Sequence, residues 1–289
     1  MRGRILPLGE VFLVTALWAS SFVAVRVVLD HAGPLTVASL RYTLAALLLL
    51  PWVRWNRLRH APSRGWIWRR LVAIGVSQYT VGNVALFSAL ILVTSSAASL
   101  ALCLTPVAVW ILEAAWLRDR LRRLQMLGSA IAVASCVAFF SGGATGLTPA
   151  AVGLLAVATL SFAVLPLLGR QIARSRAVDN ITLTAVPLLL GGGILIPVAA
   201  AVEGIPRMPL SAWGIIGGLA TVNTLAAYLL YNHALHRLRA GEANIVLNLI
   251  PLGTALIAWS TLGERLTPLQ MGALGLAIAG VSLAQYRGK

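Results

Sequence analysis

Long apolar segments separated by short polar ones dominate this sequence. A helix needs about 20 apolar residues to cross the hydrocarbon core of a bilayer. Ten segments of this kind follow one another, at residues 8–29, 34–53, 71–92, 96–117, 124–141, 150–169, 180–202, 211–235, 241–262 and 267–285. They are too long and too unalternating for barrel strands, and only helices or closed barrels satisfy the backbone in lipid. The pattern predicts an all-α polytopic membrane protein with ten transmembrane helices.

The stretch 247–284 repeats a design that occurs 145 residues earlier. Without a gap, Leu104, Pro106, Leu117, Arg120, Leu121, Leu124, Gln125 and Met126 recur as Leu249, Pro251, Leu262, Arg265, Leu266, Leu269, Gln270 and Met271, and Asp119 corresponds to Glu264. The chain is therefore interpreted as two five-helix repeats, residues 1–145 and 146–289. Because five is odd, the second repeat enters the membrane in the opposite orientation, which makes the repeats inverted.

Charge fixes the expected orientation. The chain is 59% hydrophobic and 11% charged, with a mean hydropathy of +0.87 and a net charge of +15. If the N-terminus is cytoplasmic, 19 of the 23 Lys and Arg residues fall in cytoplasmic segments. This bias follows the positive-inside rule, so the basic charge serves topology and anionic headgroups, and nucleic acid is not an expected partner. We expect a multi-pass protein of the plasma (inner) membrane with both termini cytoplasmic and residues 141–149 outside.

Sets of catalytic or metal-binding residues are not evident. Cys103 and Cys136 both lie in apolar helices. The four histidines, His31, His60, His233 and His236, lack the HExxH-type spacing of a metal site. The sequence therefore predicts no cofactor, no metal and no enzyme activity, with an intramembrane enzyme as a remote alternative.

Uncharged polar residues recur at four-residue spacing on three of the predicted helices. Such pairs share a helix face. The offset of 145 residues places Asn83 on Tyr228 and Tyr79 on Thr224. Polar stripes on corresponding helices of inverted halves are expected to meet near the midplane, as in transporter sites; hydrogen bonding between helices is the alternative. The predicted substrate-binding residues are Trp18, Arg41, Tyr79, Asn83, Tyr228, Asn232, Asn244 and Asn248, with Arg41 near the outer mouth of a central cavity.

Charges inside the predicted helices need a partner or a wet cavity. Arg41 could serve a cavity, pack against backbone carbonyls or snorkel outward, whereas Arg26 is expected to snorkel. Glu113 is interpreted as the only carboxylate inside a span, in an interfacial ion pair. His233 is a possible titrating group, although a structural hydrogen bond is the expected role. This scarcity of acidic groups argues against a proton pump, and proton coupling stays open.

Proline and small residues suggest roles in helix bending and helix packing. Pro106 and Pro251 are predicted to lie at matching mid-helix positions, where proline kinks a helix, and to act in gating; static kinks are the alternative. Small residues at Gly128-Ala132-Cys136 and Gly275-Ala279 predict close-packing seams on the fifth and tenth helices. A monomer is expected, with a dimer as the alternative.

Three stretches resemble a known family. LWASSFVAVR, GPLTVASLRYTLAALLLLP and LGERLTPLQMGALGLAIAGV are similar to signatures of EamA-type members of the drug/metabolite transporter superfamily. The resemblance covers nearly the whole chain and is strongest at residues 247–284, and the overall resemblance is to the YddG-type amino-acid exporters. The resemblance implies a secondary transporter that exports small metabolites, among which aromatic or other neutral amino acids are favoured, by alternating access. A channel or facilitator for small polar solutes is the alternative. One departure is Leu-Arg-Asp-Arg-Leu at residues 117–121, where the second repeat has Leu-Gly-Glu-Arg-Leu.

Overall fold

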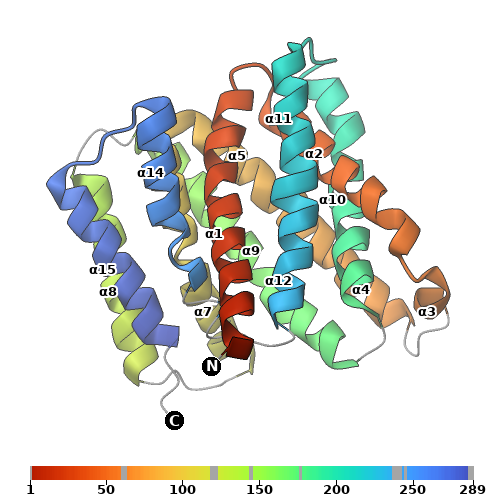
Figure 1. The fold of residues 1–289 in the computed structure, drawn as a ribbon, viewed down its shortest axis with the longest axis horizontal. Coiled ribbons are helices and arrows are strands. Elements are labelled where there is room, and N and C mark those ends of the chain that lie inside the picture. The colour runs from red at the N-terminus through yellow and green to blue at the C-terminus, as the bar shows by residue number, and fades with distance from the viewer. Residues whose placement is uncertain are drawn as a thin grey trace. The chain divides into compact units, whose positions relative to one another are not determined.

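Helices make up the whole described structure. The computed structural model describes residues 2–59, 64–117, 123–142, 146–175, 178–235, 243 and 246–285, and every element in these ranges is a helix (Figure 1). Nine helical stretches there are long and apolar enough to cross a membrane, and the apolar helix Ile250–Leu262 is shorter. The all-α, multi-helix prediction is confirmed, while the number ten stays a prediction.

Two compact units divide the chain. Unit 1 comprises Met1–Val23, Ala89–Leu155 and Ala227–Lys289, and unit 2 comprises Ala24–Ser88 and Ala156–Ala226. Each unit therefore takes helices from both predicted repeats. The units cut across the division at residue 145 that the sequence suggests, because counterpart helices of the two repeats pack together inside each unit.

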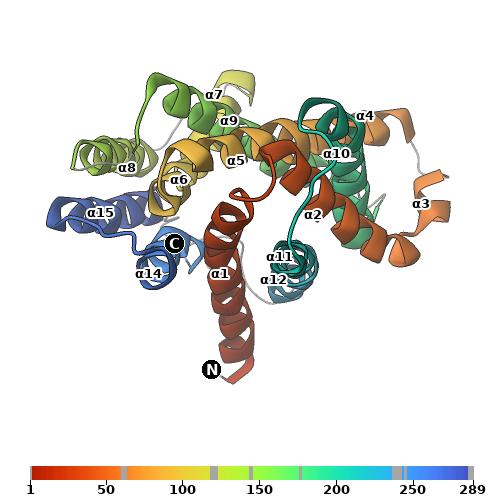
Figure 2. The same cartoon turned by 90° about the horizontal axis from the view of Figure 1, so that it is seen from above.

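Unit 1 contains a tight seam between counterpart helices. Its elements are the first part of α1 (Arg2–Val28), the end of α5 (Asn83–Leu92), α6 (Ser95–Leu102), α7 (Thr105–Leu117), α8 (Arg123–Ser141), the start of α9 (Pro149–Ser175), α12 (Ala227–Leu235), α14 (Ile250–Leu262) and α15 (Pro268–Gln285). Gly128 of α8 lies against Gly280 and Ala284 of α15, whereas Gly142 lies against Leu269 and Gln270. Ascending residues in one helix meet descending residues in the other, so α8 and α15 run antiparallel, side by side in Figure 2.

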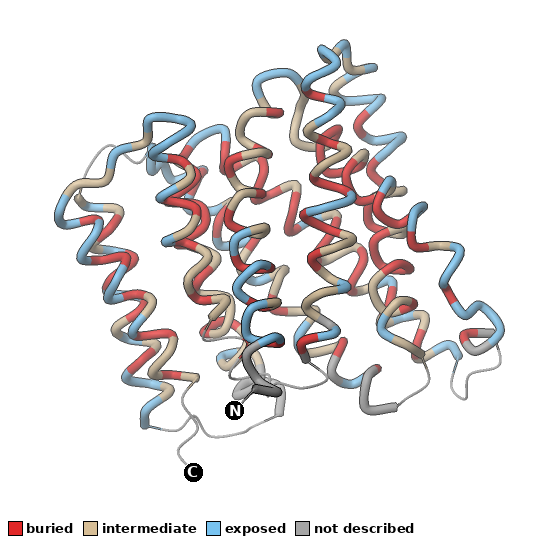
Figure 3. Tube along the Cα trace, in the orientation of Figure 1, coloured by how far each residue is buried: buried red, intermediate tan, exposed pale blue. Residues whose placement is uncertain are grey.

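The predicted seam is correct on α8 and wrong on α15. Ala132 is fully buried, and a Cβ atom on Gly280 would lie 2.8 Å from the Ala132 nitrogen. Gly275 has open space around it, and Ala279 is exposed. The side of α15 that meets α8 instead carries Ala273, Ala277, Gly280 and Ala284, all buried. Figure 3 shows buried and exposed positions alternating along both helices.

Unit 2 contains a second antiparallel pair. Its elements are the end of α1, α2 (Pro34–Leu49), the short helices η1 (Leu50–Trp52) and α3 (Trp55–Arg59), α4 (Arg64–Ile74), η2 (Gly75–Gly82), the start of α5, most of α9, α10 (Asn180–Val202), α11 (Leu210–Ala220) and η3 (Thr221–Ala226). Thr36, at the start of α2, bonds to Glu203, at the end of α10, while Thr43 lies against Gly192. Hence α2 and α10, the second helices of the two repeats, also run antiparallel (Figure 2).

Carboxylates cap a helix N-terminus in each unit. In unit 2, Glu203 accepts hydrogen bonds from the backbone N–H groups of Leu35 and Thr36, at 2.9 and 2.8 Å. In unit 1, Glu264 accepts them from Ser95, at 2.7 Å, and from Ser96, at 3.2 Å. A negative group at a helix N-terminus satisfies free donors and complements the helix dipole. These contacts hold α2 to the end of α10 and α6 to the turn before α15.

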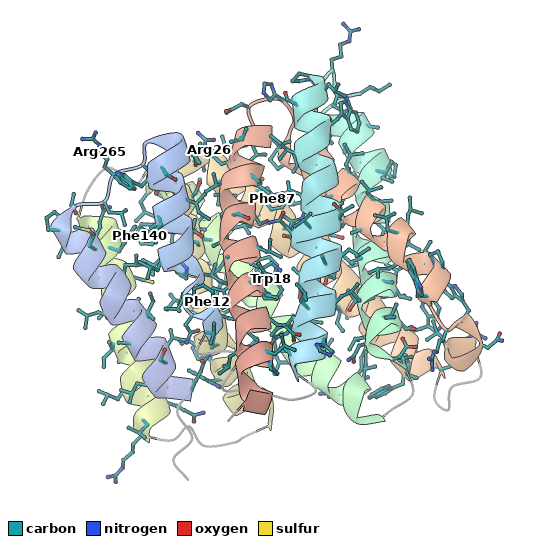
Figure 4. The ribbon with its side chains drawn as sticks, viewed as in Figure 1. Phe12, Trp18, Arg26, Phe87, Phe140 and Arg265 are labelled. Carbon is teal, nitrogen blue, oxygen red and sulfur yellow. The ribbon has the colours of Figure 1, made fainter. Side chains whose placement is uncertain are left out.

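Glycine gives the turn before α15 its shape. Gly263 ends α14 with φ 68°, and the N–H of Glu264 then bonds to the carbonyl of Ala258 at 3.2 Å. A left-handed residue at this position is glycine's ordinary role in ending a helix. Arg265, next in the chain, is exposed and points away from the helices in Figure 4. Its counterpart segment, residues 118–122, lies outside the described residues.

Pro106 and Pro251 begin helices instead of kinking them, so the mid-helix prediction is wrong. Between α6 and α7 the chain leaves the helix at Cys103 and Leu104, and Pro106 is the second residue of α7. Pro251 is likewise the second residue of α14, after turn residues Asn248 and Leu249. Proline fits a first helical turn because its missing N–H would have no partner there. The two prolines still occupy corresponding positions of the repeats, and each follows a break between two helices.

The seam predicts a contrast between two alanines. Ala132→Leu should destabilise the folded protein by about 1–3 kcal/mol, because a larger side chain would force the backbones of α8 and α15 apart. Ala279→Leu, on an exposed position of α15, should leave stability nearly unchanged. Thermal unfolding of both purified variants in detergent measures the difference. Equal effects of the two substitutions would contradict the assigned seam.

Candidate functional site

Two π-helical segments in unit 2 lie one repeat apart. Segment η2 covers Gly75–Gly82, and η3 covers Thr221–Ala226, within the 220–227 that the offset of 145 predicts. At the end of η2, Asn83 Nδ2 donates to the carbonyl of Gln78 at 2.7 Å, and within η3, Thr224 Oγ1 donates to the carbonyl of Leu219 at 2.9 Å, each five residues back. π-Helical turns are rare and frequently mark functional sites. The polar stripes predicted on these helices are therefore also places of irregular backbone.

Consecutive residues of α2 contact the two π segments. Arg41 Nε donates a hydrogen bond to Thr224 Oγ1 of η3 at 3.0 Å. The ring of Tyr42 lies 5.2 Å from the ring of Tyr79 in η2, and its hydroxyl donates to Asn83 Oδ1 at 2.6 Å. Tyr79 and Thr224 are counterparts under the repeat. The pair Arg41–Tyr42 thus joins two equivalent positions, one from each half of the chain.

The site in unit 2 is buried and held from several sides. Arg41 is 6% exposed, Asn83 5% and Tyr79 3%. The guanidinium carbon of Arg41 lies 5.2 Å from the centroid of the Tyr42 ring, and the Phe87 ring stacks on Tyr42 at 6.4 Å. A cation over an aromatic ring is stabilised by the quadrupole of the ring. Arg41 does not snorkel outward, because its side chain bonds to Thr224 inside unit 2.

Glycines of α10 allow this cluster to form. A Cβ atom on Gly191 would clash with the Gly75 carbonyl and lie 2.6 Å from Tyr79 Cβ, and one on Gly192 would lie 3.0 Å from Tyr42 Cβ. Thr80 Oγ1 also donates to the Gly191 carbonyl at 3.0 Å. Small residues permit close helix approach in membranes. Gly191 and Gly192 therefore bring α10 against η2 and α2, where Tyr79 and Tyr42 meet.

The other predicted residues lie in unit 1, where two of them meet. The Trp18 ring, on α1, lies 5.7 Å from the Tyr228 ring in an edge-on arrangement and 5.5 Å from Tyr231 (Figure 4). Asn248 is buried, and its amide donates to Ser282 Oγ at 3.2 Å and Gln285 Oε1 at 3.1 Å on α15. These bonds join Asn248 to the end of α15 and not to the aromatic group. The side chain of Asn232 and the whole of Asn244 lie outside the described residues.

Two features escaped the sequence interpretation. Tyr42, which links Arg41 to Tyr79 and Asn83, was not a predicted site residue; its signal is its place beside Arg41. Glu10 lies inside the first span, so Glu113 is not the only carboxylate in one. His233 Nδ1 lies 2.9 Å from Glu10 Oε1, in an ion pair whenever the imidazole is protonated. Neighbouring spans bring these two together, which no spacing along the chain could indicate.

The comparisons with known proteins agree with this architecture. The model of the EamA-like transporter family matches residues 8–141 and again residues 149–286. The chain belongs to the EamA-like transporter family. The family model matches the chain twice, which confirms both the predicted duplication and the resemblance noted in the sequence. The chain is accordingly a membrane transporter by family, and the boundary at residue 145 stays a prediction.

Relatives of similar length include named transporters. A probable terminal-alkyne amino-acid exporter of Streptantibioticus cattleyicolor is 29% identical over 288 residues, covering 95% of this chain and 92% of that protein. The uncharacterized inner membrane transporter YedA of Escherichia coli K12 is 23% identical over 291 residues, covering 98% and 93%. One crystal structure has a TM-score of 0.66 at 18% identity, covering 98% of this chain and 96% of that one. At that identity the likeness concerns the fold alone.

The site predicts a contrast between two threonines of η3. Thr224→Val should destabilise the protein by about 1.5–3 kcal/mol, because it removes the acceptor of a buried, charged donor. Thr221→Val should have little effect, since Thr221 is exposed and bonds only to the Gly217 carbonyl of its own helix. Thermal unfolding of the two variants, measured in parallel, gives the difference. A Thr224→Val protein as stable as the wild type would show that the Arg41 contact contributes nothing.

Proposed function

We propose that the chain is a secondary transporter that exports small metabolites, with neutral and aromatic amino acids favoured, by alternating access between two inverted repeats. The observation that carries this proposal is the pair Arg41–Tyr42, which joins repeat-equivalent positions Thr224 and Tyr79 through buried polar contacts. Transporter sites of inverted-repeat folds are built from irregular helices at corresponding positions of the two halves. Family membership and the exporter among the relatives support the same activity.

Antiparallel packing of counterpart helices supports the inverted arrangement. The second helices of the repeats, α2 and α10, run antiparallel in unit 2, and the fifth helices, α8 and α15, do so in unit 1. Counterpart helices that pack antiparallel are expected when two repeats have opposite orientations in the membrane. Ten spans, five in each repeat, follow if the apolar helix α14 crosses together with the residues that precede it.

The chemistry of the cluster suits a small solute with polar and aromatic parts. The hydroxyl of Tyr42 and the amide of Asn83 are uncharged groups, whose hydrogen bonds contribute roughly 0.5–1.5 kcal/mol each. Bonds of this strength orient a solute without preventing its release. The rings of Tyr42, Tyr79 and Phe87 supply apolar surface beside them. Trp18 and Tyr228, which meet in unit 1, are proposed as a further aromatic contact for the solute.

Flux measurements test the site. In proteoliposomes, a panel of labelled amino acids should include at least one whose flux saturates and shows counterflow, which a channel does not give. Tyr79→Ala should lower that flux at least tenfold while the protein stays folded and monodisperse. Phe12→Ala is the matched control, because Phe12 is an exposed aromatic residue of α1 (Figure 4). Normal flux and substrate preference in Tyr79→Ala would place the site elsewhere.

Orientation in the inner membrane is a separate proposal. The bias of Lys and Arg places both termini in the cytoplasm, and YedA is an inner membrane transporter. A cysteine replacing Gly143 should react with an impermeant thiol reagent added outside the cell, whereas a cysteine replacing Arg59 should not. Labelling at residue 59 alone would reverse the orientation. Cys103 and Cys136 are buried, so they do not obscure the readout.

A proton-coupled mode is favoured by one observation. Glu10 and His233 form a carboxylate–imidazole pair between α1 and α12, and such groups in transporters serve as proton relays. Under this mode, an imposed pH gradient accelerates flux in the wild-type protein and not in Glu10→Gln. Equal flux with and without the gradient in the wild-type protein would identify facilitated export.

A further inference from the structure

We infer that the basic, tryptophan-rich segment 52–70 of unit 2 binds the headgroup of an anionic phospholipid, at a surface separate from the proposed solute site. The segment lies between α2 and η2 in the chain and comprises the end of η1, the helix α3 and the first part of α4 (Figure 1). The structure describes residues 52–59 and 64–70 of it. The partner is the lipid itself, and not a soluble phosphate.

The first support is composition. Residues 52–70 contain six arginines, four tryptophans and no acidic residue. Under the offset of 145 they correspond to residues 197–215, which contain one arginine, one tryptophan and one glutamate. The positive-inside rule explains arginines on one side of a membrane, but it does not call for tryptophan, and aromatic belts occur at both interfaces. Tryptophans interleaved with arginines in one segment suit the boundary between acyl chains and headgroups, where both residue types contact the same lipid.

The second support is the order of side chains along the exposed surface of two helices. Leu47 is exposed near the end of α2, Trp52 follows in η1 with 61% exposed, and Arg54 comes next. On α4, Val72 is exposed, and Arg69 lies three residues earlier on the same face, also exposed. Both helices thus pass from apolar to cationic surface toward the segment. A phospholipid has the same order from its acyl chains to its headgroup.

The third support is that part of the cationic surface is held in place. The guanidinium carbon of Arg70 lies 3.8 Å from the centroid of the Trp66 ring, one turn earlier on α4. Arg70 Nε and Nη2 also donate to Gln171 Oε1 of α9, at 2.9 and 2.8 Å. These contacts fix a planar cation beside an aromatic ring and tie the segment to α9. A surface that is ordered before the lipid arrives loses less entropy when the lipid binds.

The charge of the segment is only partly balanced within unit 2. Asp179 Oδ2 lies 3.5 Å from Arg54 Nε, while Oδ1 accepts from the N–H of Thr182. Arg54 still has 60% of its side chain exposed, and Arg64 and Arg69 are exposed on α4. One carboxylate beside six arginines leaves a positive surface, and basic clusters beside membrane-spanning helices attract anionic lipids. The phosphodiester of such a lipid is negative and matches the fork of a guanidinium.

Quenching of tryptophan fluorescence by brominated lipids tests the inference. The purified protein is placed in phosphatidylcholine nanodiscs that contain brominated phosphatidylglycerol or, at the same mole fraction, brominated phosphatidylcholine. The wild-type protein should favour phosphatidylglycerol by about fivefold, because basic residues near the membrane surface attract anionic lipid. Arg64→Gln/Arg69→Gln should reduce this preference to less than about twofold. Arg207→Gln/Arg265→Gln should behave as the wild type, because it removes the same charge from two exposed arginines outside the segment.

Two pairs of measurements locate the lipid. Trp52→Phe/Trp55→Phe should remove about half or more of the selective quenching, because both tryptophans are exposed in the segment. Trp213→Phe, at an exposed tryptophan of α11 outside the segment, should leave the selective quenching nearly unchanged. Selective quenching that persists in the double variant and disappears in Trp213→Phe would place the lipid elsewhere and overturn the inference.

Three further results would also overturn it. Equal quenching by the two brominated lipids would show that the wild-type protein has no preference for anionic lipid. Equal losses in the two double-arginine variants would indicate diffuse surface charge, and full competition by water-soluble glycerol phosphate would indicate a site for the phosphate group alone. Should Arg64→Gln/Arg69→Gln not fold, each single substitution should still lower the preference by about half. These measurements involve no transport, so their outcome does not depend on the proposed function.

Discussion

Every irregularity in these helices has to be satisfied inside the protein, because the hydrocarbon of a membrane offers no hydrogen bonds. The chain meets this constraint with a few polar side chains. Glu264 accepts from the free N–H groups at the start of α6, and Glu203 does the same for α2. Asn83, directly after η2, and Thr224, within η3, bond to carbonyls that a regular α-helix would have engaged differently. At these four places, polar side chains thus satisfy backbone groups that the α-helix leaves open.

The same constraint explains why the candidate site lies where it does. Thr224 accepts from Arg41 with the oxygen whose hydrogen already goes to the backbone, and Asn83 accepts from Tyr42 while its amide bonds to Gln78. In the proposed site, structural and binding roles are therefore joined in single side chains. The glycines at 191 and 192 complete the arrangement by admitting α10 close to Tyr42 and Tyr79. The polar cluster of unit 2 is thus formed by two π-helical segments and by the side chains that bond to their backbone.

Features that depend on position along the chain, such as apolar length and the repeat offset, could be predicted from the sequence. The face that each helix turns to its neighbour could not. Apolar length gave the spans, and the offset of 145 residues gave the duplication. The seam on α15 was misassigned because lipid and neighbouring helices are equally apolar, so Gly275 and Gly280 look alike in sequence. The prolines were expected to kink continuous helices, since composition does not reveal that the helix has already ended at Leu104 or Leu249. Glu10–His233 and the contacts of Tyr42 join distant segments, which one sequence cannot pair. For the predicted site, three of eight residues meet through Tyr42 in unit 2, and Trp18 meets Tyr228 in unit 1.

The π segments lie near the positions at which the two compact units divide their helices. Two continuous helices pass from unit 2 into unit 1. One consists of α4, η2 and α5 and leaves unit 2 after Ser88, and the other consists of α11, η3 and α12 and leaves it after Ala226. The η2 segment ends at Gly82 and η3 ends at Ala226, so each irregular stretch comes just before its helix enters unit 1. A π turn has alternative carbonyl partners within reach, as Asn83 illustrates by directing its backbone N–H to both Gln78 and Thr80. Tyr79 and Thr224, which contact Tyr42 and Arg41, both lie in these stretches, so the polar contacts of the proposed site are made by the segments that have such alternative partners.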